Sequence, residues 1–197
     1  MRRPALGSLE LASIARGIVV LDQMAKRAET TIVAARTISP GRYWILVSGE
    51  VAEVDEAMAA AREAAREDLV ALLVLADPSE ALRQALASEL PLALGESLAI
   101  VETTTLAAAL LGLDRAVKDA GVAPLELRLG AGLTGKGVFT LTGPLHLIEA
   151  ARDVITAVVE APQLVRIELI AQPHPDLPAH LLEAEAPWVR GPSGRTR

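Results

Sequence analysis

Short apolar runs and amphipathic stretches follow each other in the same order twice along the chain. Short, uninterrupted apolar runs are typical of buried strands, whereas apolar residues spaced three and four apart indicate helices. The pattern predicts strands over residues 6–11, 31–37, 43–47 and 69–75, and again over 98–103, 125–129, 138–141 and 164–170. It predicts helices over residues 13–28 and 51–66, and again over 105–120 and 145–159.

Matched residues recur at a nearly constant separation between the two sets. Asp22 and Lys26 have counterparts in Asp114 and Lys118 at an offset of 92 (114 − 22 and 118 − 26). Further along, Gly49 matches Gly143 at an offset of 94 (143 − 49), and Pro78 matches Pro173 at an offset of 95 (173 − 78). A slow drift of this kind indicates two tandem copies of one globular domain with small loop insertions, because the copies are too long and too few for a solenoid.

The order of elements in each copy is β-α-β-β-α-β. This order is typical of the ferredoxin-like plan, in which a mainly antiparallel sheet carries helices on one face. We therefore predict an α+β (α/β) protein made of two tandem ferredoxin-like domains, the first over residues 1–92 and the second over 93–186. The first copy ends in an amphipathic stretch over 79–90, which predicts a short helix, and residues 187–197 read as a disordered tail.

Composition narrows the functional classes. The chain has 197 residues, a net charge of −6 and only four aromatic residues, so it lacks the positive field and the stacking surfaces that nucleic acid needs. It has no cysteine, which excludes disulfides, thiolate metal sites and iron–sulfur clusters. Charged residues interrupt the apolar N-terminal stretch, and no apolar run is long enough to span a membrane. We expect a cytoplasmic protein with no nucleic-acid partner and no membrane partner.

One loop resembles a phosphate-binding motif. Residues 130–137 read Gly-Ala-Gly-Leu-Thr-Gly-Lys-Gly, which contains G-x-G-x-x-G and nearly completes G-x-x-x-x-G-K-[ST]. Both motifs require a helix directly after the loop, but Val138-Phe139-Thr140-Leu141 reads as a strand. Position 137 also lacks the hydroxyl that would bind Mg²⁺. We interpret the loop as a tight turn between two strands, matched in the first copy by residues 38–42.

The remaining polar candidates do not form a catalytic constellation. His146, His174 and His180 lack the spacing of metal ligands. Glu10 and Glu102 recur at strand positions without a visible partner base or metal, so we expect carboxylates that are hydrogen-bonded across the strand or to helix N–H groups. The two Asp-x-x-x-Lys pairs have the spacing of solvated helix salt bridges. The sequence therefore predicts neither catalytic residues nor a cofactor.

The chain resembles the bacterial microcompartment shell domain in both copies. In the first copy the resemblance rests on Ala5-Leu6-Gly7-x-Leu9-Glu10, Asp22-x-Met24-x-Lys26, Ile38-Ser39-Pro40-Gly41 and Ser48-Gly49-Glu50-Val51. In the second it rests on Ile100-Val101-Glu102-Thr103, Asp114-x-x-x-Lys118, Gly132-Leu133-Thr134-Gly135 and Thr142-Gly143. Two fused copies resemble the tandem, trimeric type of shell protein, which is structural rather than enzymatic. The resemblance implies a homotrimer that acts as a pseudohexameric tile beside hexameric and pentameric shell proteins.

The resemblance also implies roles for particular residues. The central pore would be lined by three copies each of Ser39, Pro40, Gly41, Leu133, Thr134 and Gly135, and would pass small polar metabolites. Arg42 and Lys136 would stand at its vestibule and favour anions. Lys26, Lys118 and His174 would lie at contacts between tiles.

The chain departs from the family pattern in one place, favours the single-layer kind of tile and excludes the iron–sulfur variant. Relatives carry an arginine after the last strand, where this chain has Gln172 and Asp77, which leaves the edge contact open. The unpermuted order favours a single-layer tile, and relatives that hold an iron–sulfur cluster at the axis use cysteine, which this chain lacks. Two other functions stay open on the residues alone: a small-molecule- or phosphate-binding regulatory trimer of ferredoxin-like domains, and a nucleotide-hydrolysing enzyme.

Overall fold

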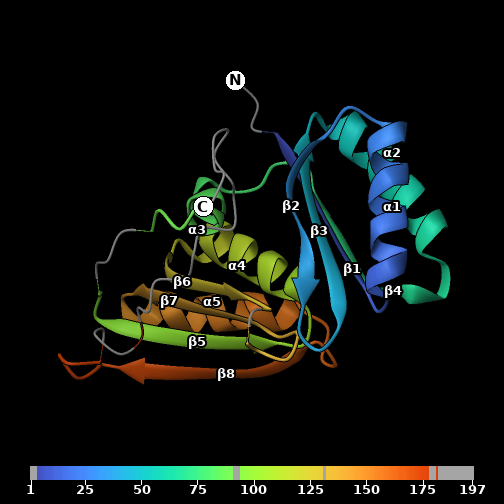
Figure 1. Ribbon diagram of the computed structural model, residues 1–197. Helices are drawn as coiled ribbons and strands as arrows, with labels where there is room; N and C mark the ends of the chain where they lie inside the picture. The colour runs from blue at the N-terminus through green and yellow to red at the C-terminus, as the bar shows by residue number, and fades with distance from the viewer. Residues whose placement is uncertain (1–3, 91–93, 131, 178–180, 182–197) are drawn as a thin grey trace, which may run out of the picture. The chain divides into compact units, whose positions relative to one another are not determined.

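Two units make up the chain, and each repeats the same set of elements (Figure 1). The structure, a computed structural model, describes residues 4–90, 94–130, 132–177 and 181. By its contacts the chain divides between Pro78 and Ser79. The first unit contains β1 (Ala5–Leu11), α1 (Ile14–Arg27), β2 (Thr31–Ile38), β3 (Arg42–Gly49), α2 (Val51–Ala65), the 3₁₀ turn η1 (Arg66–Asp68) and β4 (Leu69–Leu75). The second contains α3 (Glu80–Leu86), β5 (Ser97–Thr103), α4 (Leu106–Ala120), β6 (Ala123–Leu129), β7 (Gly137–Gly143), α5 (Leu145–Val158) and β8 (Leu164–Ala171).

A capping residue begins the first helix of each repeat, and a glycine ends that of the second repeat. The Ser13 hydroxyl accepts a hydrogen bond from the Arg16 N–H, and the Thr105 hydroxyl accepts one from the Ala108 N–H (both 3.2 Å). Each cap satisfies one of the backbone donors that a helix N-terminus leaves without an intrahelical partner. Gly121 ends α4 in the left-handed conformation (φ 70°). The predicted caps are confirmed at all three positions.

Both sheets are antiparallel and have the same strand order. The orders are β2-β3-β1-β4 and β6-β7-β5-β8, which is the ferredoxin-like arrangement predicted from the order of elements. Glu10 lies opposite Trp44 in the first sheet, and Glu102 lies opposite Val138 in the second. Each central strand therefore presents its glutamate near the start of the neighbouring strand, at the end of the sheet where the β2–β3 or β6–β7 turn lies.

Two helices cover one face of the sheet in each unit, α1 and α2 in the first and α4 and α5 in the second. In the first unit α1 and α2 pack against each other and on β1 and β3, around a core that includes Leu9, Ile45 and Met58. Helix and strand approach closely in both repeats, but different residues allow it. A Cβ on Gly17 of α1 would come within 2.5 Å of Tyr43 on β3, whereas a Cβ on Gly137 of β7 would come within 2.4 Å of the Ala109 Cβ on α4.

Helix α3 packs on elements of the second repeat. The sequence put residues 79–90 in the first domain, which was expected to end at residue 92. In the structure α3 packs on β6 and α4, and Leu82, Ala85 and Leu86 are buried there. The physical reason is that its apolar side matches a surface of the second repeat, which local periodicity does not identify. The expected tail at 187–197 lies outside the described residues.

Candidate assembly and pore elements

The β2–β3 turn of the first repeat consists of exposed residues. Ile38 ends β2 and Arg42 begins β3, and the Gly41 N–H donates to the Ile38 carbonyl (3.1 Å). Gly41 has φ +86°, a conformation that glycine adopts without steric cost. Ser39, Pro40 and Gly41 are all exposed, and the Ser39–Pro40 peptide bond is cis. The turn therefore offers small, uncharged groups to its surroundings.

The matching turn of the second repeat is longer and more tightly packed. The Gly130 N–H donates to the Lys136 carbonyl, and the Lys136 N–H donates to the Leu133 carbonyl (both 3.0 Å). Thr134 and Gly132 are exposed, Leu133 is half-buried and Gly135 is buried. Strand β7 begins at Gly137, directly after the turn. The interpretation as a strand–strand turn is confirmed, since both phosphate-binding motifs need a helix at this point.

The cation that follows each turn is paired with the glutamate of the central strand. Arg42 Nη1 lies 3.7 Å from Glu10 Oε2, and Lys136 Nζ lies 2.8 Å from Glu102 Oε2. Glu10 is fully buried and Arg42 is mostly buried, whereas Glu102 and Lys136 are both partly exposed. Each positive charge at the base of a turn therefore has a negative charge beside it, which reduces its field at longer range.

This pairing was missed in the sequence, where the two glutamates had no visible partner. A signal was present, because Glu10 and Glu102 recur together with Arg42 and Lys136. In both repeats a whole helix and a strand separate the glutamate from its cation along the chain, which hides the contact. The antiparallel pairing of β1 with β3 and of β5 with β7 brings the members of each pair together.

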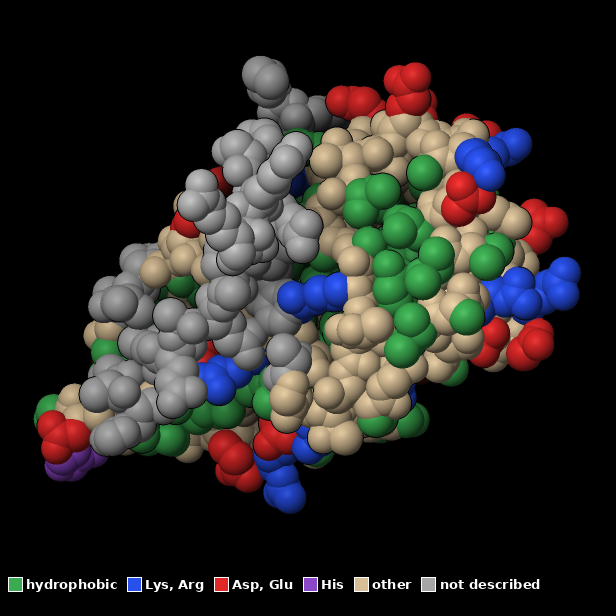
Figure 2. Space-filling model, in the orientation of Figure 1, with side chains coloured by type: hydrophobic (Ala, Val, Ile, Leu, Met, Phe, Trp, Pro, Cys, Tyr) green, Lys and Arg blue, Asp and Glu red, His purple; other side chains and the backbone are tan. Residues whose placement is uncertain are grey.

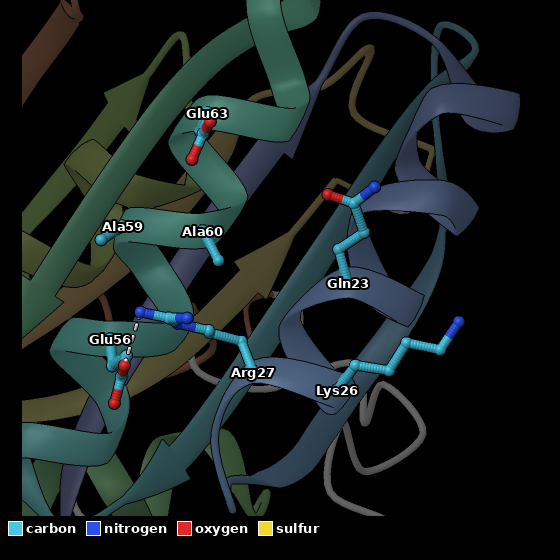
Figure 3. Close-up of a pocket in the computed structure, with 7 residues that line it drawn as sticks. All are labelled: Gln23, Lys26, Arg27, Glu56, Ala59, Ala60 and Glu63. Atoms are coloured by element: carbon cyan, nitrogen blue, oxygen red, sulfur yellow. Dashed lines mark ion pairs between the residues drawn. The ribbon is translucent and has the colours of Figure 1, made fainter.

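Around Lys26 the helices α1 and α2 leave a groove of about 460 Å³ (Figure 3). The Lys26 ammonium lies 2.6 Å from the Asp22 carboxylate, and both side chains are largely exposed. In Figure 3 the Lys26 side chain points away from the ion pair of Arg27 and Glu56, whose closest atoms are 2.9 Å apart. The groove is lined by Gln23, Lys26, Arg27, Glu56, Ala59, Ala60 and Glu63. Lys26 therefore stands at the surface with its charge accessible.

The matching pair in the second repeat is in a different environment. Lys118 Nζ lies 2.8 Å from Asp114 Oδ2, but Asp114 is buried. The other oxygen, Oδ1, accepts a hydrogen bond from the backbone N–H of Ser79 (2.6 Å), the N-cap residue of α3. Asp114 thus holds both Lys118 and the start of α3. The same motif is a surface ion pair in one repeat and a buried anchor in the other.

His174, the third expected edge residue, follows β8 and is exposed. Its Nδ1 accepts a hydrogen bond from the Asp176 N–H (3.3 Å). The Leu177 N–H donates to the His174 carbonyl (3.0 Å), so a turn begins here. Among the described residues, no three His, Asp or Glu side chains are grouped so that they could hold a metal ion. Within that same part of the chain, every helix is too short or too polar to cross a membrane.

The fold and these sites define a tandem-domain protein in which a glycine-containing turn and a flanking ion pair occur twice. The chain belongs to the family of the BMC domain, which matches residues 5–78 and 97–173. This family is structural rather than enzymatic. The match to both halves confirms the tandem pair of domains expected from the duplication.

Similar proteins agree with this assignment. The chain is 30% identical over 180 residues to the bacterial microcompartment shell protein PduT of Citrobacter freundii, covering 91% of this chain and 98% of that one. It is 31% identical to a microcompartments protein from Desulfitobacterium hafniense DCB, with a TM-score of 0.78 over 89% of this chain and 98% of that one. A fused permuted hexameric shell protein from the RMM microcompartment, 22% identical, shares the fold, with a TM-score of 0.59 over 79% of this chain and 83% of that one.

Proposed function

We propose that the chain is a structural shell protein of a bacterial microcompartment that forms a homotrimeric, pseudohexameric tile with a central pore. Shell-protein relatives support assembly with other shell proteins. The observation that carries the proposal is the doubled domain: three chains with two BMC domains each would supply six sides to a tile. Neighbouring hexameric and pentameric shell proteins would complete the shell.

The two turns are proposed to meet at the threefold axis. Three copies of Ser39, Pro40 and Gly41 would alternate with three copies of Leu133, Thr134 and Gly135. The exposed, uncharged turn of the first repeat supports a pore for small polar metabolites. The paired charges at Arg42 and Lys136 support a vestibule with only a weak preference for anions, since each cation already faces a glutamate.

Lys26 is the proposed contact residue at the tile edge in the first repeat, because its ammonium is exposed beside the groove between α1 and α2. Lys118 and His174 are proposed for the other edges. Lys118 is the more constrained of the two lysines, since the buried Asp114 holds its ammonium. The edge chemistry therefore differs between alternate sides of the tile.

The mass of the assembled particle tests the tile. Light scattering after size exclusion should give three times the chain mass of 20.7 kDa, and electron microscopy at higher concentration should show sheets. A particle that keeps the mass of a single chain at every concentration would refute the trimer.

The pore assignment has its own test, which the absence of cysteine makes simple. Residues near a threefold axis lie close to their own copies, so a short bismaleimide should join Ser39→Cys chains to one another. Ala59→Cys, which is exposed on α2, should stay uncoupled under the same conditions. Equal coupling of the two variants would show that the turn does not face the axis.

A further inference from the structure

The outer side of α1 carries apolar side chains that are exposed, whereas their counterparts on α4 are buried. Ile18 is 56% exposed, and Leu110, which matches it at the offset of 92, is 1% exposed. Ile14 is likewise exposed and its counterpart Leu106 is buried. Figure 2 shows further apolar side chains gathered over β2, where Ile32 is also exposed. We call Ile14, Ile18, Asp22 and Ile32 the α1–β2 surface.

In the second repeat, helix α3 covers the surface that corresponds to the α1–β2 surface. Helix α3 packs on α4 and β6, and its N-cap residue Ser79 donates its backbone N–H to Asp114. Asp114 stands one helical turn after Leu110 on the same side of α4, so α3 starts over this side. Asp114 is 1% exposed, whereas the side chain of its counterpart Asp22 is 57% exposed. The first repeat thus presents the same acceptor and the same apolar side.

The chain contains a second segment of the same design. Ser79 follows Pro78 after β4, and His174 follows Pro173 after β8. Leu82 stands three residues after Ser79, as Leu177 does after His174, and both begin a turn: the Leu82 N–H donates to the Ser79 hydroxyl and the Leu177 N–H to the His174 carbonyl.

One end of the described part of this segment is anchored. At Leu181 it is held to its own unit by a hydrogen bond from Arg128 to the Leu181 carbonyl. Residues 174–177 precede that anchor and are the ones that correspond to the start of α3.

We infer that the α1–β2 surface is the docking surface for a second copy of this chain, whose residues 174–177 occupy it as α3 occupies α4 and β6. The backbone N–H of His174 donates to Asp22, and Leu177 packs against Ile18. The inference rests on the proposed trimer, to which it assigns one of the two contacting surfaces. It also gives Asp22 a role separate from the edge contact of Lys26.

A charge placed on the surface tests this contact. Ile18→Asp adds a carboxylate to an exposed position, so each unit should stay folded by circular dichroism while the particle falls from the trimeric mass to that of one chain, 20.7 kDa. Gln23→Asp is the matched control, because it adds the same charge to the same helix on the side that lines the groove with α2. The control should keep the trimeric mass.

Cross-linking places the contact directly. Ala25 lies on the same side of α1 as Asp22, and Pro175 follows His174, so Ala25→Cys and Pro175→Cys in one chain leave both contact residues intact. A short bismaleimide should join such chains into covalent dimers and trimers. The corresponding pair of the second repeat, Val117→Cys with Glu80→Cys, should link within a single chain and keep its mobility on a denaturing gel.

The outcomes separate this inference from the function on which it rests. A wild-type particle that never exceeds the mass of a single chain refutes the proposed trimer itself. A wild-type trimer that survives Ile18→Asp, or whose Ala25 and Pro175 cysteines link within one chain or not at all, leaves the tile standing and overturns this docking surface. Loss of the trimer in both Ile18→Asp and Gln23→Asp also overturns it, because the effect would then not depend on the side of α1.

Discussion

The ion pairs beside the two turns should contribute very unequally to stability, and the longer one should matter more. Arg42 and Glu10 are 3.7 Å apart, and the Glu10 side chain is 0% exposed. With an effective dielectric constant of about 20, two unit charges at this distance attract by about 4 kcal/mol. Lys136 and Glu102 approach to 2.8 Å, but Glu102 is 37% exposed, and exposed pairs of this kind contribute about 0–1 kcal/mol.

Removing the cation exposes this difference. Arg42→Ala leaves a buried carboxylate without its nearby positive charge, and breaking a buried pair in this way costs about 3–5 kcal/mol. Glu10 keeps further interactions, so we expect the free energy of unfolding of the first unit to fall by about 2–4 kcal/mol. Lys136→Ala leaves Glu102 in contact with water and should lower the free energy of unfolding of the second unit by less than about 1 kcal/mol.

Urea unfolding followed by circular dichroism measures both values. Tryptophan fluorescence isolates the first unit in a Trp188→Phe background, because the buried Trp44 is then the only tryptophan. Combining Arg42→Ala with Glu10→Gln should recover much of the loss, since a neutral amide costs less to bury than a carboxylate. Equal losses for the two alanine variants, or a larger loss for Lys136→Ala, would refute the argument from burial.

Three further changes test other parts of the structure. Gly137→Ala should lower the free energy of unfolding by about 1–3 kcal/mol in urea titrations, because its Cβ would lie 2.4 Å from the Ala109 Cβ. Ala109→Gly in the same chain should restore part of the lost stability. If it restores none, the close approach of α4 and β7 is contradicted. Asp114→Ala should lower the free energy of unfolding by about 1–3 kcal/mol and speed hydrogen exchange at the Ser79 backbone N–H, which donates to Asp114. Unchanged exchange at Ser79 would show that α3 does not depend on this anchor. Lys26→Ala should stop sheet formation in electron micrographs without changing the trimeric mass, while Lys118→Ala should in addition lower stability; sheets formed by both variants would remove the lysines from the edge.

The sequence predicted those features that depend on local spacing or on repetition. Ser13 and Thr105 cap the N-termini of α1 and α4, and Gly121 caps the C-terminus of α4, as expected, because capping depends on residues within one turn. The strand order followed from the order of elements. The turn over residues 130–137 was identified as such because a strand-like run follows it, because position 137 lacks a hydroxyl, and because the other repeat has a turn at the same place.

Features that depend on distant contacts were missed. The apolar side of α3 showed that the helix packs on another element, but periodicity carries no information about the partner, so its contacts with β6 and α4 were not predicted. The two Asp-x-x-x-Lys motifs are indistinguishable in sequence, yet Asp22 is exposed and Asp114 is buried. That difference arises because the N-cap residue of α3 lies against Asp114, and no local pattern encodes it.

The covalent link between the repeats bears on how the proposed tile would come apart. Helix α3 is tethered to the unit on which it packs, so its docking is intramolecular and has an effective concentration on the order of millimolar. Docking of residues 174–177 on the α1–β2 surface of another chain has no such advantage and depends on protein concentration. The proposed trimer would have three α3 contacts within chains and three contacts of residues 174–177 between chains. On dilution the contacts within chains would therefore persist while those between chains separate. The expected dissociation product is the intact chain of 20.7 kDa, reached without loss of α3 packing, so dilution should lower the mass while the protection of the Ser79 amide against hydrogen exchange stays constant. A simultaneous loss of mass and of that protection would mean that the two kinds of contact are not independent.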